Sequence, residues 1–139
     1  MLTVEKVLLL SSVGFFADLP GDMLANIASM FEEVEILRGE HVVVKGDFGT
    51  SLYLVATGSV RVHDGDKEFA VLGERDIFGE LAALSPEPRT ATVTAVEDAI
   101  LLKIEHEALY ELIAEHTELA KNIIRFLCSR YRESITHGH

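Results

Sequence analysis

The chain has 139 residues, of which 48% are hydrophobic and 25% are charged, so we expect one soluble globular domain over residues 1–139 with a core of its own. Its formal net charge is −11, and the excess of acids runs through both halves. Such a field repels nucleic acid and anionic membrane. We therefore expect no direct contact with nucleic acid or membrane within this chain, while a DNA-binding domain elsewhere in a longer protein stays open.

The single cysteine, Cys128, cannot form a disulfide within the chain, which indicates a reducing compartment and hence the cytoplasm. Because Cys128 lies in an apolar helical pattern, we expect it to be buried. The apolar run at residues 7–10 is too short to span a membrane, and it lacks the basic start of a signal peptide.

Residues 1–31 have the pattern of short helices. VEKVLLL is one apolar helix, which Gly14 and Pro20 separate from a second helix in DMLANIASMF. In that second segment the apolar residues recur at intervals of three and four, as on one face of a helix.

Residues 32–104 read as about eight short strands with turn signals every 8–12 residues, a spacing typical of a sandwich or barrel. The run DGDK at residues 64–67 is a strong hairpin signal, because Asp-Gly favours the positive φ of a tight turn. The predicted fold class is mainly β with flanking helices, namely an eight-stranded β-roll or jelly roll.

Residues 105–136 return to helical spacing, and the last helix is both amphipathic and basic. Between Leu119 and Arg132 it has four cations and no acid. In one interpretation it packs on the barrel and pairs with the chain's own acids. In the other it also covers a ligand or packs against a second subunit.

Residues 78–93, FGELAALSPEPRTATV, combine Glu80 and Arg89 with a glycine and small side chains. Gly79 follows a strand and precedes a helix-forming run, so free backbone N–H groups are expected there. Arg89 offers the planar donor pattern that binds phosphate, and a charged Glu80 accepts hydrogen bonds from hydroxyls. These groups favour a sugar phosphate pocket. The alternative is a plain ion pair between Glu80 and Arg89 beside a structural turn.

This stretch resembles the phosphate-binding cassette of the cyclic nucleotide-binding domain found in the catabolite activator protein, in regulatory subunits of cyclic-nucleotide-dependent kinases and in cyclic nucleotide-gated channels. RGEHVVVKGDFGTSLYLVATGSVRV resembles the β-roll of that family. The resemblance implies that Glu80 accepts the ribose 2′-hydroxyl, with the Gly79 backbone beside it, and that Arg89 binds the exocyclic oxygen of the cyclic phosphate. It further implies that the N–H groups of Ala82 and Thr90 complete the phosphate cradle, with Leu81 and Ala91 packing around it.

The resemblance implies cAMP or cGMP as the ligand and no other cofactor. Thr90 is permissive for cGMP, because its hydroxyl can reach a syn guanine, and it does not exclude cAMP. The base would lie against strand residues Phe69, Val71 and Leu72. The final helix would cap the base, with the candidates Arg125, Leu127, Arg130 and Tyr131.

Three functions are weighed. The first is a sensor that draws the cassette inward on binding and repositions the last helix, acting on an effector domain or protein or within a homodimer. The second is a nucleotide-independent β-roll that serves interaction or dimerisation. The third is an enzyme of the cupin type, which needs a cluster of metal ligands. We reject it because the histidines of this chain are not expected to cluster. His41 and His63 are isolated on separate strands, His106 and His116 lie on helices, and His137 and His139 lie in the tail.

Overall fold

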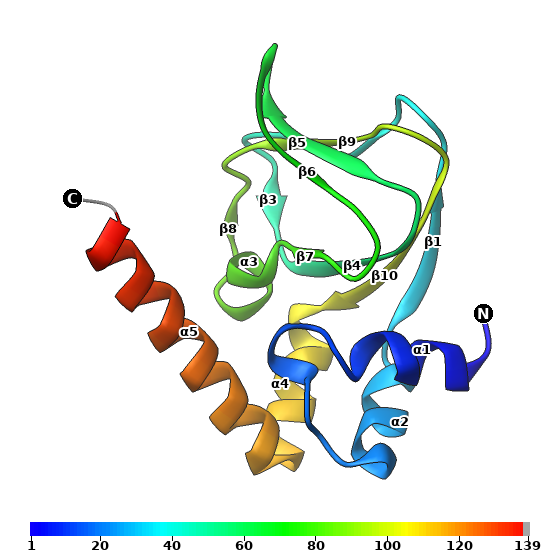
Figure 1. Ribbon diagram of the computed structural model, residues 1–139, viewed down its shortest axis with the longest axis vertical. Coiled ribbons are helices and arrows are strands. Elements are labelled where there is room, and N and C mark those ends of the chain that lie inside the picture. The colour runs from blue at the N-terminus through cyan, green and yellow to red at the C-terminus, as the bar shows by residue number, and fades with distance from the viewer. Residues whose placement is uncertain (138–139) are drawn as a thin grey trace.

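The computed structural model describes residues 1–137, with helices at both ends of the chain and strands between them (Figure 1). The predicted tail residue His139 lies outside the described residues. The elements are α1 (Thr3–Leu10), the 3-10 helix η1 (Gly14–Phe16), α2 (Gly21–Ser29), β1 (Glu32–Ile36), β2 (His41–Val43), β3 (Phe48–Gly49), β4 (Ser51–Thr57), β5 (Val60–Asp64), β6 (Lys67–Leu72), β7 (Ile77–Phe78), α3 (Glu80–Leu84), β8 (Glu87–Pro88), β9 (Thr92–Ala95), β10 (Ala99–Glu105), α4 (His106–Glu115) and α5 (Thr117–His137). The predicted class, mainly β with flanking helices, is confirmed.

The strands form two four-stranded antiparallel sheets, in the orders β1-β10-β4-β7 and β2-β9-β5-β6, and the short pair β3-β8. A first cluster of apolar side chains lies between the two large sheets, and it includes Tyr53, Val60, Phe78, Val93 and Leu101. Alternation along each strand explains this arrangement, because every second side chain points to the same face.

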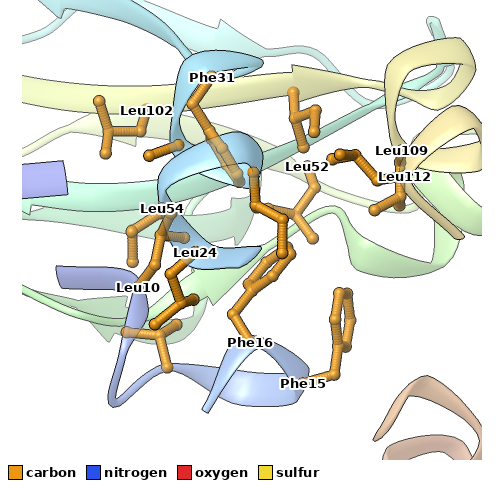
Figure 2. Packing of buried hydrophobic residues seen from close by; sticks show 14 of the residues in the cluster. Leu10, Phe15, Phe16, Leu24, Phe31, Leu52, Leu54, Leu102, Leu109 and Leu112 are labelled. Atoms are coloured by element: carbon orange, nitrogen blue, oxygen red, sulfur yellow. The ribbon is translucent and has the colours of Figure 1, made fainter. Parts of the chain in front are cut away.

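Strand β4 is buried on both faces, and this explains why its sequence, SLYLVAT, is apolar almost throughout. Tyr53 and Val55 belong to the cluster between the sheets. Leu52 and Leu54 point the other way, toward the helices. Figure 2 shows these two leucines packed with Leu10, Phe16 and Leu109 in the second cluster, which joins the sheet to the helices.

The Asp-Gly hairpin forms where the sequence predicts it, since Asp64 pairs with Lys67 and Gly65 has φ 58°. Residues 1–137 form ten strands in place of about eight. The extra ones are β3, which falls in the predicted GDFG turn, and β8, which contains Pro88. These two-residue strands pair with each other, and such a contact between distant segments leaves no periodic pattern in the sequence.

The environment of Cys128 differs from the prediction, because its side chain on α5 is exposed. The helix buries Leu119 and Ile123, near its start. Farther along, its apolar side chains Ile124, Leu127, Tyr131 and Ile135 are exposed, so the apolar spacing continues beyond the part of the helix that packs on the core. None of the helices within residues 1–137 is long and apolar enough to span a membrane.

Candidate functional site

Gly79 opens the cassette, which we define as residues 78–93, in a conformation that favours glycine. It lies between β7 and α3 with φ 78°, in the left-handed region. A Cβ at this position would lie 2.6 Å from the Ser51 carbonyl oxygen and 2.7 Å from Nη1 of Arg89. Both the backbone angle and the lack of space therefore require glycine here.

The backbone of Arg89 is fixed at the far end of the cassette by the loop before β3. Its N–H donates to the Asp47 carbonyl at 2.7 Å, and its carbonyl accepts from the Gly46 N–H at 2.9 Å. The pair β3-β8 adjoins these bonds. The predicted turn at residues 46–49 thus positions the arginine, although it lies about 40 residues away in the sequence.

The Arg89 side chain lies between two glycines. A Cβ on Gly49 would meet Nε of Arg89 first and would lie 2.6 Å from Cζ, whereas a Cβ on Gly79 would lie 3.7 Å from Cζ, so the side chain passes closer to Gly49. Nη2 donates to the Ser51 carbonyl at 3.0 Å, and Cζ lies 6.0 Å from the centre of the Tyr53 ring. The guanidinium is therefore held in one place by backbone, a carbonyl and an aromatic face.

Arg89 is a half-buried cation that makes no salt bridge within residues 1–137. Burial lowers the pKa of Arg89 below its ordinary value, and charges on Tyr53, Glu105 and Glu87 oppose that effect. Burying a charge is unfavourable unless it is paired. The site thus holds a positive charge with room for an anionic partner.

Glu105 on β10 is a carboxylate whose charge acts on Arg89, and it is already bound to other groups. It pairs with Lys103 at 3.2 Å and accepts a bond from the Thr50 hydroxyl at 2.9 Å. Burial alone would raise the pKa of Glu105, but hydrogen bonds from Ser51, Thr50 and Lys103 outweigh burial and hold that pKa below its ordinary value. These partners leave Arg89 without a carboxylate of its own.

Glu80 is buried, and its partner is on α5. Oε1 accepts from Nη2 of Arg130 at 2.8 Å. The side chain of Glu80 is 10% exposed, whereas that of Arg130 is 55% exposed. The alternative drawn from the sequence, an ion pair between Glu80 and Arg89, does not form among the described residues, so the acid and the base serve separate partners.

A cavity of about 160 Å³ opens between these groups. Its lining comes from both ends of the cassette, namely Gly79, Glu80, Leu81, Ala82, Glu87, Pro88, Arg89 and Thr90. Six of the seven predicted contact residues therefore meet at one cavity. Ala91, the seventh, follows Thr90 and is half-buried, but it does not line the cavity.

Residues 33–116 match the family model described as "Cyclic nucleotide-binding domain". This chain belongs to that family. The match contains the β-roll and the whole cassette, so it covers each of the groups described above except Arg130.

Relatives of known structure or role agree with the assignment to the cyclic nucleotide-binding domain family. The CRP-like cAMP-activated global transcriptional regulator of Mycobacterium tuberculosis is 28% identical over 131 residues, which cover 91% of this chain and 58% of that regulator. The cyclic AMP receptor protein of Thermus thermophilus is 37% identical over 111 residues, which cover 76% of this chain and 51% of that protein. The chain thus spans little more than half the length of these relatives.

The N-terminal domain of a transcriptional regulator from Streptomyces coelicolor A3(2) has the same fold. It superposes with a TM-score of 0.84 at 30% sequence identity, and the match covers 94% of this chain and 95% of that one. The fold shared with this structure therefore extends over nearly all of both chains.

The strand residues expected against the base do not gather at the cassette cavity of this cyclic nucleotide-binding domain. Leu72 packs into the cluster between the sheets. Val71 lies on the opposite face of β6 from Leu72, because side chains alternate along a strand. Phe69 lies where the β5-β6 register shifts, and the two side chains are 52% (Phe69) and 55% (Val71) exposed. Neither one lines the cavity.

Of the four candidates for capping the base, α5 brings only Arg130 to the cassette by a hydrogen bond. Arg125 donates to the Asn122 side chain at 3.0 Å instead. Leu127 lines a separate apolar groove, and Tyr131 is 64% exposed. The capping assignment for these residues stays a prediction.

Three residues that position Arg89 were missing from the sequence prediction: Gly49, Ser51 and Tyr53. The glycines of KGDFGTS predict turns. The neighbouring residues in the sequence do not distinguish a glycine that forms a turn from one, such as Gly49, that leaves space for the side chain of a residue far away in the sequence. Ser51 acts through its backbone carbonyl, which any residue carries. Tyr53 looked like an ordinary strand residue. A covariation signal between residues 49 and 89 is the kind of information that finds such contacts.

The histidines predicted to be isolated, His41 and His63, are in fact close together. They lie on β2 and β5, the two strands that flank β9, and both contact the Thr94 hydroxyl, from His41 Nδ1 at 2.8 Å and from His63 Nε2 at 2.7 Å. His63 also bonds the Gly65 carbonyl through Nδ1 at 2.8 Å. Within residues 1–137, no group of three or more metal-ligating side chains gathers.

Proposed function

We propose that the chain is a regulatory module that binds a cyclic nucleotide, cAMP or cGMP, at the cassette and relays binding through movement of the cassette and α5. The observation that carries this proposal is the unpaired, half-buried guanidinium of Arg89 at the cassette cavity. A phosphate diester provides the missing charge and two acceptor oxygens in the geometry that arginine prefers.

The choice of cyclic nucleotide rests on two supports. The relatives from Mycobacterium and Thermus carry cAMP in their names, which favours cAMP. Thr90 lines the cavity next to Arg89, and a hydroxyl can donate to or accept from a guanine, which keeps cGMP in the proposal. The ribose 2′-hydroxyl is assigned to Glu80, since a carboxylate is an acceptor.

The relay is proposed to run through the pair formed by Arg130 and Glu80. Among residues 1–137, this pair is the one hydrogen bond between α5 and the cassette. A ribose hydroxyl bound at Glu80 competes with Arg130 for the same carboxylate. Ligand binding then alters how firmly α5 is held, which is the differential interaction that a binding-driven change requires.

Calorimetry with cAMP and with cGMP, up to millimolar concentration, tests the binding step. Saturable heat with either nucleotide is expected, together with a rise in the unfolding temperature. No heat and no thermal shift with both would remove the proposal. Extraction of nucleotide from the purified protein, with identification by mass, decides which of the two it carries.

Substitution of Arg89 by Leu tests the assigned phosphate contact. Affinity should fall by about 2–4 kcal/mol, because a charge-assisted pair is lost. The matched control is Arg38→Leu, which removes the same charge from an exposed turn outside the cassette and should leave affinity unchanged. Equal affinities of the two variants would contradict the role of Arg89.

A nucleotide-independent dimerisation module is the second candidate, and the exposed apolar side chains of α5 favour it. They recur at intervals of three and four on the helix: Ile124 is 61%, Leu127 36%, Tyr131 64% and Ile135 49% exposed. A second copy of the chain could cover them. Sedimentation velocity and calorimetry together separate the two candidates. The dimerisation module should sediment as a dimer with and without nucleotide, and it should give no heat of binding with cAMP or cGMP.

The proposal includes a cytoplasmic location, no enzymatic activity, and an effector domain or partner protein that responds to α5. The mode of action of the relatives supports the last point, because both are named as regulators or receptors and are longer than this chain. The net charge of −11 repels nucleic acid. We therefore propose that these residues contact a protein effector and do not themselves contact nucleic acid.

A further inference from the structure

The short helix of the cassette is held at its C-terminal end by two side chains of α4. His106 Nδ1 donates to the Ala83 carbonyl at 2.6 Å, and the Tyr110 hydroxyl donates to the Leu84 carbonyl at 2.5 Å. The last carbonyls of a helix have no partner within it. Here both partners come from one neighbouring helix, and we call this pair of donors the His106–Tyr110 clamp.

The two donors form a rigid unit on α4. They are four residues apart, so they lie on one face of the helix, and their ring centres are 4.3 Å apart. The carbonyl of Ala83 can only accept, so Nδ1 of His106 must carry the proton. The backbone N–H of His106 also donates to the Thr50 carbonyl at 2.8 Å, which ties the start of α4 to the sheet.

The clamp leads directly to α5. Helix α4 ends at Glu115, and α5 starts at Thr117, so the two helices share one short connection. Tyr110 also lines an apolar groove of about 410 Å³ to which three helices contribute. Its lining residues are Leu84 and Ser85 at the end of α3, Tyr110 and Ile113 on α4, and Ala120, Ile123, Ile124 and Leu127 on α5.

We propose that the His106–Tyr110 clamp is a second link between the cassette and α5, which carries a displacement of the α3 backbone through α4 and acts beside the direct pair of Arg130 and Glu80. This inference rests on the proposed function, since the displacement is the one that cyclic nucleotide binding causes. His106 and Tyr110 are positioning residues, because they line no part of the cassette cavity. They act on α3 through its backbone, so the link does not depend on which side chains α3 presents to the ligand.

The exposed native Cys128 provides the means of testing the clamp. A nitroxide on Cys128 and a second one on Asp66→Cys, at the exposed tip of the β5-β6 hairpin, report the distance from α5 to the sheets. The distance is measured with and without saturating cAMP or cGMP. The variants are Tyr110→Phe, His106→Leu, their combination, and His106→Asn, which keeps an N–H donor near the position of Nδ1.

Loss of the clamp should uncouple the helix from the ligand while leaving the binding groups in place. In the combined variant the ligand-induced change in distance should fall by about half or more, and affinity should change by less than about tenfold. His106→Asn should restore the response that His106→Leu loses. Ser11→Ala, which removes a hydroxyl-to-carbonyl bond of 2.8 Å at the end of α1, should respond like the unmodified protein.

The outcomes separate the two proposals. An undiminished change in distance in the combined variant, with nucleotide bound, would overturn the clamp and leave the proposed function standing. A response that fails in His106→Asn as fully as in His106→Leu would overturn the role of the Nδ1 donor. An unmodified protein that binds neither nucleotide would overturn the proposed function, and the clamp's role with it.

Discussion

The two halves of α5 differ sharply in how they are attached to the rest of the molecule. In the first half Leu119 and Ile123 are buried. Asn122 donates to the Phe15 and Ala17 carbonyls at 3.2 and 3.1 Å, and the Phe126 ring meets the Phe15 ring edge to face at 5.3 Å. Packing and hydrogen bonds to η1 thus fix this half on the N-terminal segment.

The second half, from Leu127 to His137, has one cross-element contact of a polar kind among the described residues, the pair between Arg130 and Glu80. Its apolar side chains are exposed, and in Figure 1 this half runs past α3 to the level of β8, with its end standing apart from the strands. An ion pair with one partner in solvent is worth about 1 kcal/mol or less. The comparison teaches that the core fixes the first half, whereas the one polar contact that holds the second half to the cassette is weak.

Substitution of the neighbouring residues Ile123 and Ile124 by alanine should give the largest difference in the free energy of unfolding. Ile123→Ala should destabilise the fold by about 2–4 kcal/mol, because it removes buried methyl groups and leaves a cavity. Ile124→Ala, at 61% exposure, should cost less than about 0.5 kcal/mol. Urea unfolding measures both values. Equal losses would show that Ile124 is covered in solution, and dependence on protein concentration would identify a second copy as the cover.

Asn122 should give an intermediate effect. Asn122→Leu leaves the Phe15 and Ala17 carbonyls without their side-chain donor, so the free energy of unfolding should fall by about 1–2 kcal/mol. The exposed neighbour Lys121 provides the control, since Lys121→Leu should change stability by less than about 0.5 kcal/mol. If both variants unfold at the same urea concentration, the anchor role of the Asn122 amide is wrong.

Arg130→Gln should give the smallest change in global stability, below about 1 kcal/mol, and yet free the second half of α5. Amide hydrogen exchange should accelerate over residues 127–137 and stay unchanged over residues 117–126. Arg132→Gln makes the same change in net charge two residues away and should leave both segments unaffected. Equal rates of amide hydrogen exchange over residues 127–137 in the two variants would show that the pair of Arg130 and Glu80 does not hold this segment.

The dependence on salt concentration tests the contribution of the Arg130–Glu80 ion pair without a substitution. Raising ionic strength from about 0.1 to 1 M shortens the screening length from about 10 to 3 Å, so exchange over residues 127–137 should rise slightly in the unmodified protein. In Arg130→Gln the salt effect on this segment should be absent. A rise of equal size in both proteins would assign the effect to helix fraying instead of to the ion pair.

Local patterns were enough to predict the class of fold and the location of the cassette. The alternating strands, the Asp-Gly hairpin and the helical spacing all depend on neighbours in sequence, and these predictions agree with the structure. The partners of side chains depend on segments far apart, so the sequence did not indicate that Glu80 pairs with Arg130 or that Gly49 makes room for Arg89. The error on Cys128 has a related cause, because helical spacing shows which face is apolar and not how far along the helix that face stays covered.

The two glycines around Arg89 have a thermodynamic consequence for any anion that binds there. An arginine side chain carries about 2 kcal/mol of rotamer entropy, which a flexible surface arginine loses when it captures a ligand. Here Gly49, Gly79 and the Ser51 carbonyl confine the guanidinium before a ligand arrives, so that ordering is completed during folding. For the proposed phosphate contact, this preorganisation favours affinity, an effect separate from any contact that Gly79 makes with the ribose.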